Sequence, residues 1–63
     1  MERNYAMMNI IELRKALKDR TMITKAELLE IMNNKVVRNA IYSDYDQYTI
    51  MLIDGSEFYL VIG

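Results

Sequence analysis

The chain has 63 residues, of which 52% are hydrophobic and 27% are charged, and its formal net charge is −1. A chain of this length forms one domain whose core supplies only a few kcal/mol of net stability. It contains no cysteine and no histidine, which excludes a disulfide framework, the usual zinc sites and the common nucleophile and base pairs of enzymes. We therefore expect one domain over residues 1–63 that is not an enzyme, uses no cofactor, metal or small-molecule substrate, and gains stability as a homodimer.

Hydropathy along the chain predicts where the protein resides. No stretch reaches 18 consecutive apolar residues, so we expect no membrane span. The start, Met1-Glu2-Arg3-Asn4, is not followed by the long apolar run of a secretory signal. Together with the absence of cysteine, these features predict a cytoplasmic protein.

The charges are unevenly distributed. Residues 1–40 carry a net charge of +3, whereas residues 41–63 carry four acids and no base. This asymmetry is typical either of a basic surface for an anionic partner or of an ordinary solvated helix face. The bases that would contact an anion or a nucleic acid are Arg14, Lys15, Lys18, Lys35 and Arg38.

Two helix starts are the first signals along the chain, and residues 1–8 before them predict an N-terminal arm or a short strand. Asn9-Ile10-Ile11-Glu12 and Thr24-Lys25-Ala26-Glu27 each match the capping box, in which a polar side chain and an acid three residues later bond reciprocally to the backbone. Apolar side chains at helical spacing follow each cap and predict two short helices. These side chains are Ile10, Leu13, Ala16 and Leu17 in the first helix and Leu28, Leu29, Ile31 and Met32 in the second.

Residues 35–42 fit two structures. As a helix, the segment is amphipathic, with its polar side chains on one side. As a strand, it pairs with residues 48–53 through a turn at residues 43–47, which places Tyr42 opposite Tyr48. We favour the strand because Val36, Val37 and Ile41 are strand formers and because the pairing sorts the side chains into two distinct faces.

Asp54-Gly55 lies between two apolar runs and predicts a hairpin with a two-residue type I′ turn. Such a turn places Ile53 opposite Ser56, so that Met51, Phe58 and Leu60 face the helices. The other face is then rich in tyrosine, which is a favoured interface anchor. We expect this second face to form a dimer or partner interface made of Tyr42, Tyr48, Ile50, Tyr59 and Val61.

These elements predict an α+β fold in which two short N-terminal helices pack on a C-terminal three-stranded antiparallel β-meander. The alternative is three helices plus a β-hairpin, which would be Cro-like or winged-helix-like. The preferred fold, with no catalytic groups, predicts a small regulatory protein that binds another protein of unknown identity. By type it looks like the inhibitors and antirepressors of phages and mobile elements.

The alternative fold carries a different function. Thr24-Lys25, Ala40-Ile41 and Asp54-Gly55-Ser56 fall at compatible spacing over roughly residues 24–62. If residues 34–43 are helical, these motifs make the chain similar to the Cro family of small phage repressors. The resemblance implies a dimeric helix-turn-helix DNA-binding repressor, with Lys35, Arg38 and Asn39 facing the major groove and the last strand forming the dimer. Glu30 departs from the family pattern, which has glycine at the turn.

Overall fold

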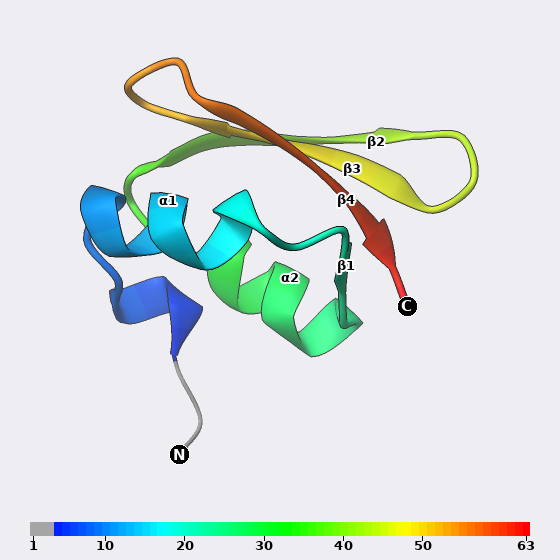
Figure 1. The fold of residues 1–63 in the computed structure, drawn as a ribbon, viewed down its shortest axis with the longest axis horizontal. Helices are drawn as coiled ribbons and strands as arrows, with labels where there is room; N and C mark the ends of the chain where they lie inside the picture. The colour runs from blue at the N-terminus through cyan, green and yellow to red at the C-terminus, as the bar shows by residue number, and fades with distance from the viewer. Residues whose placement is uncertain (1–3) are drawn as a thin grey trace.

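The computed structural model describes residues 4–63. They form two layers, with two α-helices on one face of a four-stranded mixed sheet (Figure 1). The elements in chain order are the 3-10 helix η1 (Tyr5–Met7), α1 (Ile10–Lys18), β1 (Met22–Ile23), α2 (Lys25–Met32), β2 (Val37–Ser43), β3 (Gln47–Leu52) and β4 (Glu57–Ile62). Neither helix in this part of the chain has the length and apolar composition that crossing a membrane requires.

Both helices begin where the capping boxes predict. The Asn9 side chain accepts a hydrogen bond from the Glu12 backbone N–H at 2.8 Å, and the Glu12 carboxylate accepts one from the Asn9 N–H at 2.9 Å. Thr24 and Glu27 make the same reciprocal pair at 3.1 and 2.9 Å. These bonds satisfy backbone donors that the first helical turn leaves free, which explains why each helix starts there.

Residues 37–43 form strand β2, so the strand prediction is confirmed and the three-helix alternative is wrong. Tyr42 pairs with Tyr48, as the sequence predicts. The register then shifts between Val37 and Asn39, because a bulge places an extra residue in β2. The shift turns Val37 toward the helices, where it packs against the core.

Strand β1 is the part of the sheet that the sequence analysis does not predict. Met22 and Ile23 run parallel to β4, opposite Val61 and Ile62, so the sheet has four strands in the order β1-β4-β3-β2 and is not a purely antiparallel meander. A strand of two residues is too short to show a period in the sequence. Its position depends on β4, about 40 residues away in the chain, and local pattern carries no information about that pairing.

The β3–β4 hairpin has a register one residue away from the predicted one. The Leu52 N–H donates to the Ser56 carbonyl at 2.9 Å, which leaves a three-residue turn at residues 53–55 in place of a two-residue turn. The Asp54 carboxylate accepts the Ser56 N–H at 2.9 Å, and Gly55 takes a φ of 90°. Such a conformation favours glycine, and three-residue hairpin turns commonly place glycine at this position.

The register decides which side chains of β3 meet the helices. A shift of one residue moves every side chain of a strand to the other face. Ile50 and Leu52 are therefore completely buried, and Met51 lies on the outer side, contrary to the prediction, whereas Leu60 is buried and Phe58 packs on the core as predicted. Burying Ile50 and Leu52 in place of Thr49 and Met51 keeps the threonine hydroxyl out of the core. The buried apolar residues are Tyr5, Met8, Leu13, Leu17, Ile23, Leu28, Ile31, Ile50, Leu52 and Leu60.

Asn34 is the one buried polar residue among residues 4–63, with 3% of its surface exposed. Its side-chain amide donates to the backbone carbonyls of Tyr5 and Met8, both at 2.8 Å, and its carbonyl oxygen accepts the Val36 N–H at 2.9 Å. One side chain thus holds η1 against the connection between α2 and β2. The predicted N-terminal arm or strand over residues 1–8 falls partly on residues 1–3, which lie outside the described residues, and Tyr5–Met7 form η1.

Asn34→Ala should lower the free energy of unfolding by about 3 kcal/mol, because it removes three hydrogen bonds that join η1 to the chain before β2 at a largely buried position. Urea unfolding followed by circular dichroism measures this loss. Asn33→Ala is the matched control, since Asn33 is exposed and its side chain, within residues 4–63, donates one hydrogen bond to the Leu29 carbonyl. It should lose less than about 1 kcal/mol. Equal losses in the two variants would contradict the role of Asn34.

Candidate functional site

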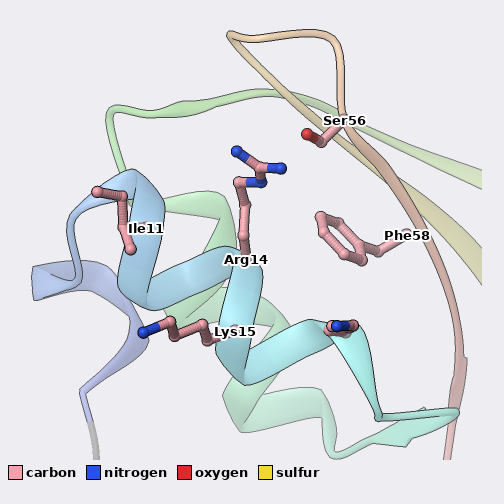
Figure 2. A pocket seen from close by; sticks show the side chains of 6 residues that line it. Ile11, Arg14, Lys15, Ser56 and Phe58 are labelled. Atoms are coloured by element: carbon pink, nitrogen blue, oxygen red, sulfur yellow. The ribbon is translucent and has the colours of Figure 1, made fainter.

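A groove of about 360 Å³ lies between α1 and the beginning of β4 (Figure 2). It is lined by Ile11, Arg14, Lys15, Lys18, Ser56 and Phe58, and we refer to these six residues as the basic groove. The four α1 residues are spaced at i, i+3, i+4 and i+7, so they lie on one face of the helix. All three charged side chains that line the groove are cations.

The groove residues differ in the direction of their side chains (Figure 2). Arg14 extends toward the Ser56 side of the groove, whereas Lys15 extends away from the hairpin. The Arg14 guanidinium lies 3.4 Å from the Asp54 carboxylate, and more than half of its side chain remains exposed. The backbone N–H of Ser56 is the main cause that lowers the pKa of Asp54, and Arg14 adds a smaller effect. An exposed ion pair of this kind contributes little to stability.

The chemistry of the basic groove suits an anion with an apolar body. The cations and the Ser56 hydroxyl can hold negatively charged oxygens, while Phe58 and Ile11 offer apolar contact. Of the five bases predicted as anion contacts, the structure brings Arg14, Lys15 and Lys18 together here. Lys35 lies exposed in the turn after α2, and Arg38 lies exposed at the β2 bulge, and neither lines the groove.

The outer face of the sheet is the second candidate surface, because both helices lie on the other side (Figure 1). The strand register places alternate side chains of β1 to β4 on this face, which we call the open face. Its members are Met22, Asn39, Ile41, Ser43, Gln47, Thr49, Met51, Glu57, Tyr59 and Val61. The exposed fractions of Met22, Ile41, Tyr59 and Val61 are 53%, 47%, 60% and 37%.

The predicted tyrosine-rich interface is divided by the hairpin register. Tyr59 and Val61 lie on the open face, but Ile50 is in the core and so cannot form part of a surface. Tyr42 and Tyr48 lie on the helix side of the sheet, with their ring centroids 5.3 Å apart in an edge-to-face arrangement. Tyr48 packs against the core, and Tyr42 remains exposed. The five residues therefore do not form one patch.

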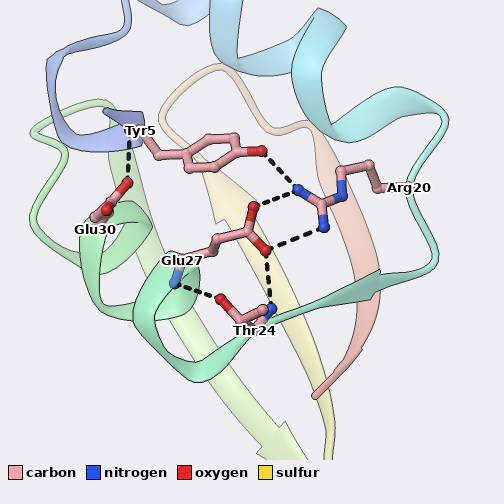
Figure 3. A network of polar contacts seen from close by, with 5 residues as sticks. All are labelled: Tyr5, Arg20, Thr24, Glu27 and Glu30. Atoms are coloured by element: carbon pink, nitrogen blue, oxygen red, sulfur yellow. Dashed lines mark hydrogen bonds and ion pairs between the residues drawn. The ribbon is translucent and has the colours of Figure 1, made fainter. Parts of the chain in front are cut away.

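A cluster of polar side chains joins η1, α2 and the segment before β1 (Figure 3). The Arg20 guanidinium donates two hydrogen bonds to the Glu27 carboxylate, at 2.6 and 3.0 Å, and a third to the Tyr5 hydroxyl at 2.6 Å. The Glu30 carboxylate accepts the Tyr5 backbone N–H at 3.0 Å. Arg20, and the Thr24 backbone after it, lower the pKa of Glu27 to about 2. Every one of these bonds is internal, so the cluster supports the fold.

Missed residues complete both candidate surfaces. Ser56 and Phe58 belong to the basic groove, and Met22, Ile41 and Met51 belong to the open face. The helical spacing of the bases on α1 was a sufficient signal for one wall of the groove. No local signal shows which strand lies across from that wall, because the pairing is set by tertiary packing.

Comparisons with known proteins add no functional assignment. A scan against protein-family models and searches of curated proteins and of solved structures found no match to this chain. Within residues 4–63, no three acidic side chains gather where they would hold a metal ion. The basic groove and the open face are therefore the two candidate sites of function.

Glu27→Gln should lower the free energy of unfolding by about 2 kcal/mol at pH 7. The folded-state pKa of about 2 lies below the ordinary value of 4.5, so the carboxylate stabilises the fold above about pH 4.5 and loses this effect as the pH falls toward 2. The difference between the wild type and the variant should therefore shrink across that range in urea unfolding experiments. A difference that does not change with pH would show that the ion pair is not its source.

Glu12→Gln is the matched control for this experiment. Glu12 occupies the same capping-box position in α1, and its recorded side-chain partner within residues 4–63 is the Asn9 backbone N–H. This variant should lose less than about 1 kcal/mol at pH 7.

Proposed function

We propose that this protein is a small non-enzymatic regulator that acts by binding another protein through the open face. The observation that carries the proposal is the exposure of large apolar side chains on the side of the sheet that the helices leave uncovered. Tyr59, Ile41 and Met22 are each about half exposed on this face. Contiguous exposed apolar surface on a small protein is typical of an interaction site.

The composition of the open face supports a protein partner over a nucleic acid. Glu57 is the one charged side chain that the strand pairings place on this face, and the exposed Arg38 lies beside the face at the β2 bulge. One acid and one base do not form the positive surface that phosphates require. Tyrosine and methionine, which it carries, are enriched at the centres of protein interfaces. The helix that a Cro-like repressor would place in the major groove is replaced here by strand β2, which leaves that alternative without its reading element.

The sheet edge is less suited to a partner than the open face. Edge strands bind other chains through their free N–H and C=O groups. In edge strand β2, the Ala40 N–H is already bonded to the side-chain oxygen of Asn39 at 2.9 Å, and the bulge near Arg38 interrupts the row of groups. These two features support recognition by side chains of the open face over strand addition.

Tyr59→Lys should abolish capture of the native partner, because it places a charge at the centre of an apolar contact, where truncation alone commonly costs about 2 kcal/mol or more. The measurement is affinity capture from the source cells, identification of the stoichiometric partner, and calorimetric titration of that partner with each variant. Tyr59 is exposed, so circular dichroism of the variant should match that of the wild type.

Leu29→Lys is the matched control, since Leu29 is 54% exposed on α2, in the helical layer. It should retain the partner. Loss of binding in Leu29→Lys but not in Tyr59→Lys would move the interface to the helices and overturn the proposal. Salt-dependent binding of the wild type to duplex DNA, without a protein partner, would favour a nucleic-acid function instead.

A further inference from the structure

The basic groove is separate from the open face and calls for its own ligand. Its three cations suit a partner with more than one anionic group, and Phe58 and Ile11 add apolar surface for an aromatic or apolar body. Asp54 stands beside Arg14 at the hairpin turn, and the chain as a whole is slightly acidic. Both features disfavour a long polyphosphate, so the groove suits a ligand that carries few negative charges.

One exposed segment of this chain has the required chemistry. Asp44, Tyr45 and Asp46 form the turn between β2 and β3, which we call the acidic turn. Tyr45 is 92% exposed, and it is flanked by two carboxylates. Tyr45 and Asp46 adopt φ values of 65° and 59°, a left-handed conformation that is unusual for a bulky aromatic residue. The turn thus presents an aromatic ring and two acids to solvent at one end of the sheet.

The acidic turn cannot reach the groove of its own chain. Figure 1 shows the β2–β3 turn at one end of the sheet, and the β3–β4 turn and the start of α1 at the other. Docking therefore needs a second copy. The two ends are complementary in charge, because the groove is lined by Arg14, Lys15 and Lys18 whereas residues 41–63 contain no base.

We propose that the protein self-associates by docking the acidic turn of one copy into the basic groove of a second copy. The Tyr45 ring packs against Phe58 and Ile11, and the two carboxylates of the turn meet the cations of α1. Reciprocal exchange, in which each copy docks its turn into the groove of the other, gives a closed isologous dimer. One-way docking is a heterologous contact and extends into longer assemblies.

Sedimentation velocity over a range of protein and salt concentrations tests the proposal on the full chain. The wild type should associate at low salt and dissociate as salt screens the charges. Lys15→Glu/Lys18→Glu, which reverses the groove, and Asp44→Lys/Asp46→Lys, which reverses the turn, should each weaken association by more than about a hundredfold, because both bring like charges together. Tyr45→Ser removes the ring without changing a charge and should also weaken association.

Mixing the two charge-reversed variants is the decisive step, because each then finds complementary charges on the other. Association should return in the mixture but in neither variant alone. Lys25→Glu/Lys35→Glu is the charge-matched control, since both lysines are exposed and lie outside the groove, and it should associate like the wild type.

Three results would overturn the proposal. They are a wild type that stays monomeric at every concentration and salt, reversed variants that associate like the wild type, and a mixture that fails to associate. Binding of a labelled DNA duplex by a monomeric wild type, lost in Lys15→Glu/Lys18→Glu, would assign the groove to phosphates instead. Tyr59→Lys should leave self-association unchanged, which separates this proposal from the function proposed for the open face.

Discussion

The turn between β3 and β4 determines which half of the hairpin becomes core and which becomes surface. Because side chains alternate along a strand, the number of residues in the turn decides the face on which every one of them lies. The Asp54 carboxylate holds the Ser56 N–H, and Gly55 supplies the left-handed residue, so the turn closes with three residues. Ile50 and Leu52 therefore point to the helices. The open face and the hairpin wall of the basic groove are both consequences of that closure.

The second constraint acts at the other side of the core, where a small number of polar bonds replaces the disulfides or metals of other small domains. Asn34 ties η1 to the chain before β2, and Arg20 ties η1 to the start of α2 through Glu27. The hydrogen bonds described for both side chains go to internal partners. In a chain of 63 residues, such bonds fix the position of segments that have too little apolar surface to be held by packing alone.

Features that depend on neighbouring residues were predicted from the sequence, and features that depend on distant ones were not. The capping boxes at Asn9 and Thr24 need only three further residues each, and they placed both helices correctly. The pairing of Tyr42 with Tyr48 needs only a short turn. Strand β1 depends on a partner far along the chain, so no local pattern revealed it.

The candidate site also contains a part that local sequence predicts and a part that it does not. The spacing of the bases on α1 predicts one wall of the groove, whereas Ser56 and Phe58 across from them belong to the hairpin and were not predicted. The error in the tyrosine-rich face arose from turn chemistry, because Asp-Gly fits both a two-residue and a three-residue turn. The hydrogen bond that the Ser56 N–H donates to the Asp54 carboxylate favours the three-residue turn, and the sequence alone does not show that this bond forms.

The hydrogen bond that the Ala40 N–H donates to the Asn39 side chain also affects how readily strand β2 can pair with another chain. Strand β2 carries Val37, Ile41 and Tyr42 at the border of the sheet, a composition that favours stacking of strands into cross-β fibrils. Growth of a fibril needs an uninterrupted row of donors and acceptors on the templating strand. One donor that is occupied internally and a bulge that breaks the row make β2 a poorer template for the addition of another strand. The apolar open face and this protected edge therefore lie side by side on the same sheet.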